Sequence, residues 1–91
     1  MEKITLDFSN CKYISQIYEE IKIKFGLPQN YGENPDALWD SLRGYSFDLT
    51  EITVMGFDNL IEKFDDYAYK IKQVFTYVTE ENKNMIFKFI K

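Results

Sequence analysis

Three short strand-like segments separated by helical patterns constrain the fold of this chain most strongly. Residues 3–8 alternate polar and apolar side chains, residues 49–55 are rich in β-branched residues, and residues 85–90 are mostly apolar. Strands that alternate with helices favour parallel pairing through crossover connections. The pattern predicts an α/β fold, a small three-stranded parallel sheet with about four helices packed against it, in a single domain over residues 1–91.

Residues that commonly cap helices set the expected helix bounds. Ser15 would cap a first helix that ends at Gly26, and Asp58 would cap a short third helix. A longer fourth helix is expected from about residue 67 to residue 82, because its apolar residues recur at helical spacing. The apolar run 85–90 predicts a strand that is buried on both faces.

The strongest local signal is the dipeptide Asn34-Pro35. Asparagine is a good N-cap, and proline suits the first helical position, where its missing N–H is not needed. Gly44 is placed to end the helix nine residues later. These residues predict a short second helix over residues 35–43.

The size and the cysteine content limit the classes of function. A domain of 91 residues has little room for a deep substrate cavity, so we expect function to lie on the surface. Cys11 is the single cysteine and has no disulfide partner within the chain. The N-terminal residues do not resemble a signal peptide, and no apolar run is long enough to span a membrane. We therefore expect a cytoplasmic protein with no membrane partner.

Negative charge is concentrated in the middle of the chain. The net charge is −4, and residues 26–66 contain nine acidic residues against two basic ones, Arg43 and Lys63. Such a segment repels nucleic acid and attracts basic proteins. Solubility alone is the simpler explanation of an acidic surface.

Motifs for enzymatic chemistry are sparse. The chain has no histidine, which removes the commonest general base and metal ligand, and Cys11 has no histidine to activate it. No Gly-rich phosphate-binding loop is present. We expect no enzymatic activity, no cofactor and no metal site. A metal-assisted hydrolase that uses Glu33, Asp36 and Asp40 stays open as a minor alternative.

The second helix carries the best candidates for a binding surface. Asp36 and Asp40 are four residues apart and therefore share a face. Asp40 lies toward the helix C-terminus, where a negative charge is mildly unfavourable, and a residue that violates local preferences is a functional candidate. Trp39, the single tryptophan, lies beside both and is either an interface residue or a half-buried core residue. Aromatic and amide side chains near the helix ends add to an interface-like composition: Asn30, Tyr31 and Tyr45.

The segment 27–44 contains a gapless string rich in uncommon residues, Tyr31-Gly32-x-Asn34-x-Asp36-Ala37-Leu38-Trp39-Asp40. This string resembles the signature of the barstar family of ribonuclease inhibitors. The order of the expected elements is also similar to that family's fold over the whole chain. Outside residues 27–45 the similarity is one of pattern, apart from Gln73-Val74-Phe75.

The resemblance implies an inhibitor of a basic, barnase-like ribonuclease. Residues 27–45, which form the second helix and the loop before it, would enter the active-site cleft of that enzyme. The resemblance places Asp40 in the enzyme's phosphate site and Asp36 at the other main acidic contact. It places Trp39 partly beneath the binding helix and partly in the interface. It assigns three further residues to the rim: Asn34, Gly44 and Tyr45.

Three positions depart from the family pattern. Asn30 replaces a tyrosine, Arg43 replaces a threonine, and Tyr77 replaces a glutamate that pairs with the enzyme. Helical spacing puts Val74, Tyr77 and Glu81 on one side of the fourth helix, and we expect them to flank the groove beside Asp40.

These departures favour a target other than barnase. We expect a different basic, extracellular-type ribonuclease or a related toxin nuclease, bound by a chain that is monomeric when free. The alternative is a protein-interaction or immunity module of the same fold with a different toxin or a non-nuclease partner.

Overall fold

The structure is a computed structural model that describes residues 1–28, 32–45 and 48–90. Its described part confirms the expected order of strands and helices. The elements are β1 (Glu2–Asp7), α1 (Ile14–Phe25), α2 (Pro35–Arg43), β2 (Thr50–Met55), α3 (Phe57–Phe64), α4 (Asp66–Glu81) and β3 (Met85–Ile90).

The strands form a three-stranded parallel sheet in the order β1-β2-β3. The register aligns Ile4 of β1 with Ile52 of β2, and Ile52 with Phe87 of β3. Helical crossovers connect the strands, as parallel pairing requires. The predicted α/β fold class is therefore confirmed.

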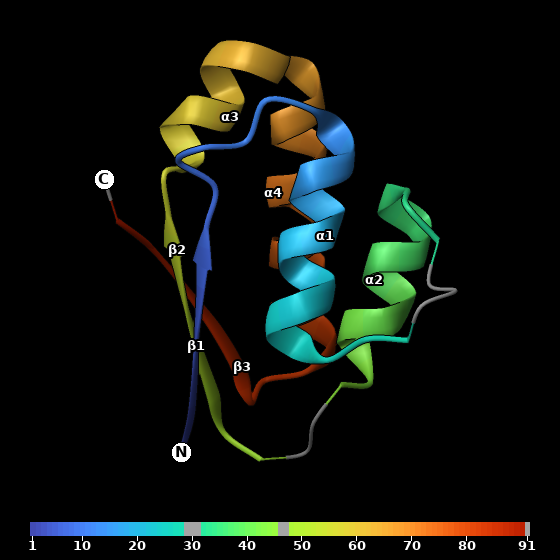
Figure 1. The fold of residues 1–91 in the computed structure, drawn as a ribbon. Helices are drawn as coiled ribbons and strands as arrows, with labels where there is room; N and C mark the ends of the chain where they lie inside the picture. The colour runs from blue at the N-terminus through green and yellow to red at the C-terminus, as the bar shows by residue number, and fades with distance from the viewer. Residues whose placement is uncertain (29–31, 46–47, 91) are drawn as a thin grey trace.

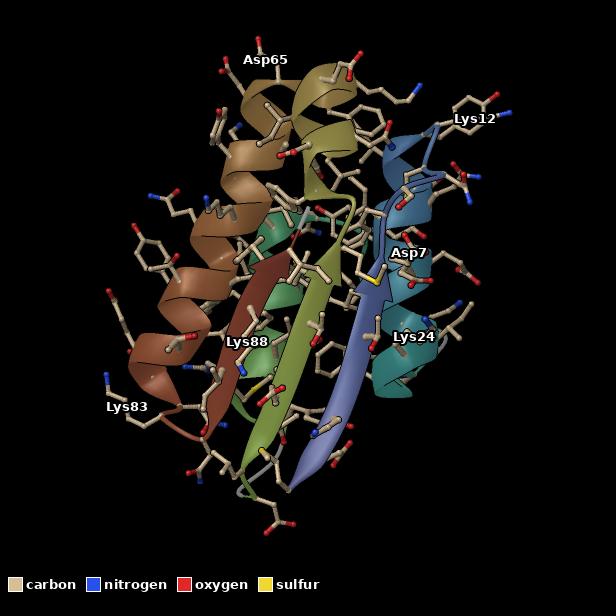
Figure 2. All side chains as sticks on the ribbon, turned by 90° about the vertical axis from the view of Figure 1, so that its left-hand side faces the viewer. Asp7, Lys12, Lys24, Asp65, Lys83 and Lys88 are labelled. Atoms are coloured by element: carbon tan, nitrogen blue, oxygen red, sulfur yellow. The ribbon has the colours of Figure 1, made fainter. Side chains whose placement is uncertain are left out.

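The helices cover one face of this sheet and leave the other face open. Leu6 and Val54, which are partners in the β1–β2 register, are fully buried beneath the helices. The alternate residues point the other way, and Figure 2 looks onto this open face, where Asp7 and Lys88 lie. Successive side chains of a strand point to opposite faces of the sheet, which separates the buried residues from those on the open face.

The prediction that β3 is buried on both faces was wrong. Met85 is buried, whereas Ile86 and Phe89 are each 39% exposed and Ile90 is 46% exposed. β3 lies at an edge of the sheet and has one open face, so its apolar side chains are only partly covered. Apolar composition alone did not reveal this position.

The prediction that Ser15 caps α1 was also wrong. The helix begins at Ile14, with Tyr13 in the capping position. The Oε1 atom of Gln16 accepts hydrogen bonds from the backbone N–H groups of Lys12 and Tyr13, at 2.6 and 3.1 Å. A side chain inside the first turn therefore satisfies the backbone just before the helix, and Ser15 is not needed.

Asp58 does not cap α3 either, because Gly56 occupies the capping position and Asp58 lies in the first turn. Gly56 has a φ of 71°, and a Cβ atom added to it would lie 2.5 Å from the backbone nitrogen of Ser9. A glycine is thus required both by the backbone conformation and by the close approach of Ser9.

Of the helices, α2 lies farthest from the sheet. Figure 1 shows α1 and α4 between the sheet and α2. α2 packs on α4, and Leu38 and Leu42 of α2 join the common hydrophobic core. The helix is therefore anchored on one side and presents its other side on the surface opposite the open sheet face.

Candidate protein-binding surface

The predicted N-terminus of α2 is confirmed by its geometry. Asn34 is extended, and its Oδ1 atom accepts a hydrogen bond of 2.9 Å from the backbone N–H of Ala37. Pro35 occupies the first turn. The cap and the proline fix where the helix begins, so the side chains that follow point in defined directions.

α2 divides into a buried and an exposed side. Leu38 and Leu42 are fully buried, which holds the helix on the core. Asp36 and Asp40 are exposed, and the Asp40 side chain is 69% exposed. Trp39 is partly buried and packs against the core, so it belongs both to the scaffold and to the surface.

A groove of about 300 Å³ lies between α2 and α4. It brings Asp36 and Trp39 of α2 together with Val74 and Tyr77 of α4. We call this the α2–α4 groove. The described residues that line it are Pro35, Asp36, Trp39, Lys70, Gln73, Val74 and Tyr77. Asp40 and Glu81 are not among these lining residues.

The residues expected on α4 have different exposures. Val74 is 7% exposed and mainly supports the core, whereas Tyr77 is 46% exposed. The hydroxyl of Tyr77 accepts a hydrogen bond of 2.9 Å from Nε2 of Gln73. Glu81 is exposed at the last residue of α4. Of these three candidates on α4, Tyr77 is therefore the one that is both exposed and part of the groove lining.

Arg43 is the last residue of α2, and its side chain contacts Asp40 and Trp39. Its Nη2 atom lies 3.1 Å from Oδ1 of Asp40, and its Cζ atom lies 4.4 Å from the centroid of the Trp39 ring. The spacings i,i+3 and i,i+4 on a helix make these contacts possible. The Nε1 atom of Trp39 is buried and has no hydrogen-bond partner among the described residues.

The remaining candidates lie at the ends of α2. Gly44 follows the helix and is exposed. Tyr45 packs edge-on against Phe25, and its hydroxyl donates to Oε1 of Glu2 at 3.1 Å. Burial raises the pKa of Tyr45, and the nearby Glu2 carboxylate raises it further. Tyr45 is thus held by its own domain. Two candidates, Asn30 and Tyr31, lie outside the described residues.

Sequence reasoning missed Lys70 and Gln73 as groove residues. Both lie on α4 and line the groove beside Val74 and Tyr77. The spacing 70, 73, 74, 77 follows one side of a helix, so helical periodicity contained the signal. Lys70 places a basic residue in a groove that otherwise contains Asp36 and apolar or amide side chains.

Residues 1–28, 32–45 and 48–90 contain no group of three or more His, Cys, Asp or Glu side chains that could hold a metal ion, so Glu33, Asp36 and Asp40 do not form one. Within the same ranges, no helix has the length and hydropathy needed to cross a membrane.

Comparison with known proteins is consistent with the fold. The family model described as "Barstar (barnase inhibitor)" matches residues 1–90. The chain belongs to the barstar family. A curated relative from Bacillus subtilis strain 168, YrdF, is named as a candidate ribonuclease inhibitor. It is 31% identical over 84 residues, which is 92% of each chain. The resemblance that the sequence suggested is therefore confirmed for this barstar-family chain.

Proposed function

We propose that this barstar-family chain inhibits a basic, barnase-type ribonuclease and is not itself an enzyme. Residues 27–45 would enter the active-site cleft, with Asp40 in place of an RNA phosphate. The observation that carries the proposal is the exposure of Asp36 and Asp40 on α2, a capped helix anchored by Leu38 and Leu42. The free chain would be a monomer in the cytoplasm.

The chemistry of the two carboxylates supports this proposal. A ribonuclease cleft holds its substrate with cationic side chains that bind phosphate oxygens. A carboxylate on a fixed helix can accept the same charge-assisted hydrogen bonds. Asp40 would make these bonds, and Asp36 would add a second acidic contact at the edge of the α2–α4 groove. Ordering the helix before binding avoids a loss of conformational entropy during binding.

The charge of the chain supports the same class of partner. The acidic segment 26–66 includes α2 and creates a field that attracts a basic protein and repels nucleic acid. Long-range attraction accelerates encounter, and the contacts made after docking determine how slowly the complex dissociates. Opposite charges on an acidic inhibitor and a basic nuclease thus favour both fast association and slow dissociation.

Enzyme inhibition tests the proposal directly. The purified chain is titrated into barnase while hydrolysis of RNA is followed. In parallel, the immobilised chain captures proteins from the culture of its native host. We expect inhibition of barnase, or capture and inhibition of a host ribonuclease. Unchanged hydrolysis by barnase together with an eluate that contains no ribonuclease would contradict the proposal.

Two observations favour a second candidate function, an interaction or immunity module for a toxin or a non-nuclease partner. Tyr77 lines the α2–α4 groove where the resembling family has a glutamate, and Arg43 is paired with Asp40. Both changes lessen the negative character of the surface. A toxin without ribonuclease activity as the main captured protein would favour this second candidate.

A further inference from the structure

Arg43 makes two contacts that bear on how α2 meets a partner. Its guanidinium group pairs with the Asp40 carboxylate at 3.1 Å, and the same group lies 4.4 Å from the Trp39 ring centroid. Asp40 is the residue that we expect in the phosphate site of the nuclease, and Trp39 lies partly in the expected interface. A single cationic side chain therefore contacts both of them in the free chain.

The contact places a cation where the partner must place its own. A guanidinium binds a carboxylate with the same charge-assisted hydrogen bonds that a cationic nuclease residue would use. The Asp40 oxygen that Arg43 occupies is less available to the partner until Arg43 moves. If Arg43 stays, its charge lies beside the cations of the cleft, and like charges in contact oppose binding.

The exposure of Arg43 makes its displacement feasible. The side chain is 46% exposed, and its carboxylate partner is 69% exposed. Exposed ion pairs of this kind change an equilibrium by at most about fivefold. A partner with strong, well-placed cations can therefore displace Arg43, whereas a weakly basic surface gains little from Asp40.

We propose that Arg43 is a specificity-determining residue that competes with the partner's cations for Asp40 and leaves the Trp39 ring when the partner binds. This inference rests on the proposed inhibition of a basic ribonuclease. It adds a prediction that inhibition alone does not contain, because removal of a charged residue from the binding surface should strengthen the complex.

A double-mutant cycle with barnase as the probe measures the competition. Dissociation constants are determined for the wild type, Arg43→Gln, Asp40→Asn and the double variant. Arg43→Gln should tighten binding by about three- to tenfold in the wild-type background, because both competition and repulsion are removed. In the Asp40→Asn background the gain should fall to about twofold or less, because only repulsion remains.

Lys63→Gln is the matched control for net charge. Lys63 lies on α3 and is exposed, and its replacement changes the charge of the chain by the same amount. We expect its effect on binding to stay below about twofold, since screening weakens exposed charges that are far apart.

A measurement on the free chain tests the contact itself. Trp39 is the single tryptophan, so incorporation of 5-fluorotryptophan gives one fluorine resonance. Arg43→Gln should move this resonance, and addition of barnase to the wild type should abolish the difference that Arg43 causes. An unchanged resonance in Arg43→Gln would overturn the inference without any reference to a nuclease.

The binding outcomes separate this inference from the proposed function. If the wild type inhibits barnase but Arg43→Gln binds equally or more weakly, the competition is refuted and inhibition stands. If Arg43→Gln tightens binding equally in both backgrounds, the effect is general repulsion and the competition for Asp40 is refuted. If neither the wild type nor Arg43→Gln binds barnase or any captured ribonuclease, the proposed function fails and this inference fails with it.

Discussion

The side-chain oxygen of Asn34 accepts a hydrogen bond from the backbone N–H of Ala37, at 2.9 Å. The backbone carbonyl of Asn34 accepts a second bond from Leu38 at 3.0 Å. These two bonds fix the start of α2 at Pro35. The direction of every side chain on the proposed binding helix depends on this start.

Asn34→Ala should lower the free energy of unfolding by about 0.5–2 kcal/mol, because the first turn of α2 loses its cap. Chemical denaturation of the free chain measures the change. Asn34→Asp keeps an oxygen acceptor at the same place and should remain close to the wild type. Equal stabilities for Asn34→Ala and Asn34→Asp would show that the cap contributes nothing.

The start of α2 and the end of α1 could be predicted from the sequence, because residues next to each boundary determine it. Asn34-Pro35 determined the start of α2, and Gly26 ends α1 with a φ of 68°, as its lack of a side chain allows. The predicted caps of α1 and α3, Ser15 and Asp58, were wrong. Gln16 replaces Ser15 as the capping side chain, and contact with Ser9 requires Gly56. Both depend on neighbours that the residue type alone does not specify.

The candidate site was predictable along each helix but not between helices. The spacing on α4 predicted that Val74 and Tyr77 share a side, and the structure places both in the α2–α4 groove. Helical spacing puts Lys70 on the same side, but only the packing of α4 on α2 shows that the groove extends as far as this residue. The partial burial of Trp39 likewise depends on that packing.

Tyr77→Glu tests whether the groove sets the choice of partner. Restoration of the acidic residue of the resembling family should improve binding to barnase by on the order of 1 kcal/mol and weaken binding to the native target. Tyr69→Glu is the matched control, because Tyr69 lies on the same helix, is 52% exposed and does not line the groove. If Tyr77→Glu alters neither affinity, Tyr77 is part of the scaffold and does not set specificity.

Ionic strength should act mainly on the association rate. The acidic segment 26–66 attracts a basic nuclease. Salt at about 0.1–0.15 M limits the range of this attraction to about 8–10 Å. Stopped-flow association with barnase should slow by about tenfold from low to high ionic strength, while dissociation changes little. Association rates that stay flat across this range would exclude electrostatic steering.

The stability of the chain should fall at alkaline pH through Cys11. Burial raises the pKa of this thiol, and the Glu20 and Asp7 carboxylates raise it further. The pKa of Cys11 is higher in the folded chain than in the unfolded chain. The contribution of the neutral, buried thiol to the free energy of unfolding is therefore complete below the ordinary thiol pKa of about 8.5, and it is lost as the pH rises through the folded value. The stability difference between the wild type and Cys11→Ala should therefore narrow as pH rises. A constant difference from neutral to alkaline pH would contradict this pKa shift.

Asp40→Ala tests the central claim most directly. Removal of one member of a desolvated charge pair costs about 2–5 kcal/mol or more, because the partner's cations remain buried without a counter-charge. Stability of the free chain should barely change, since the Asp40 side chain is 69% exposed. Glu62→Ala is the matched control, because it removes one negative charge from α3 and leaves α2 unchanged.

The decisive measurement is the inhibition constant of the wild type and of Asp40→Ala, determined with the same barnase-type ribonuclease. We expect Asp40→Ala to weaken inhibition more than any other single substitution, while Glu62→Ala stays close to the wild type. An Asp40→Ala variant that inhibits within about threefold of the wild type, a difference far below the cost of breaking a buried charge pair, would show that Asp40 does not occupy the active site.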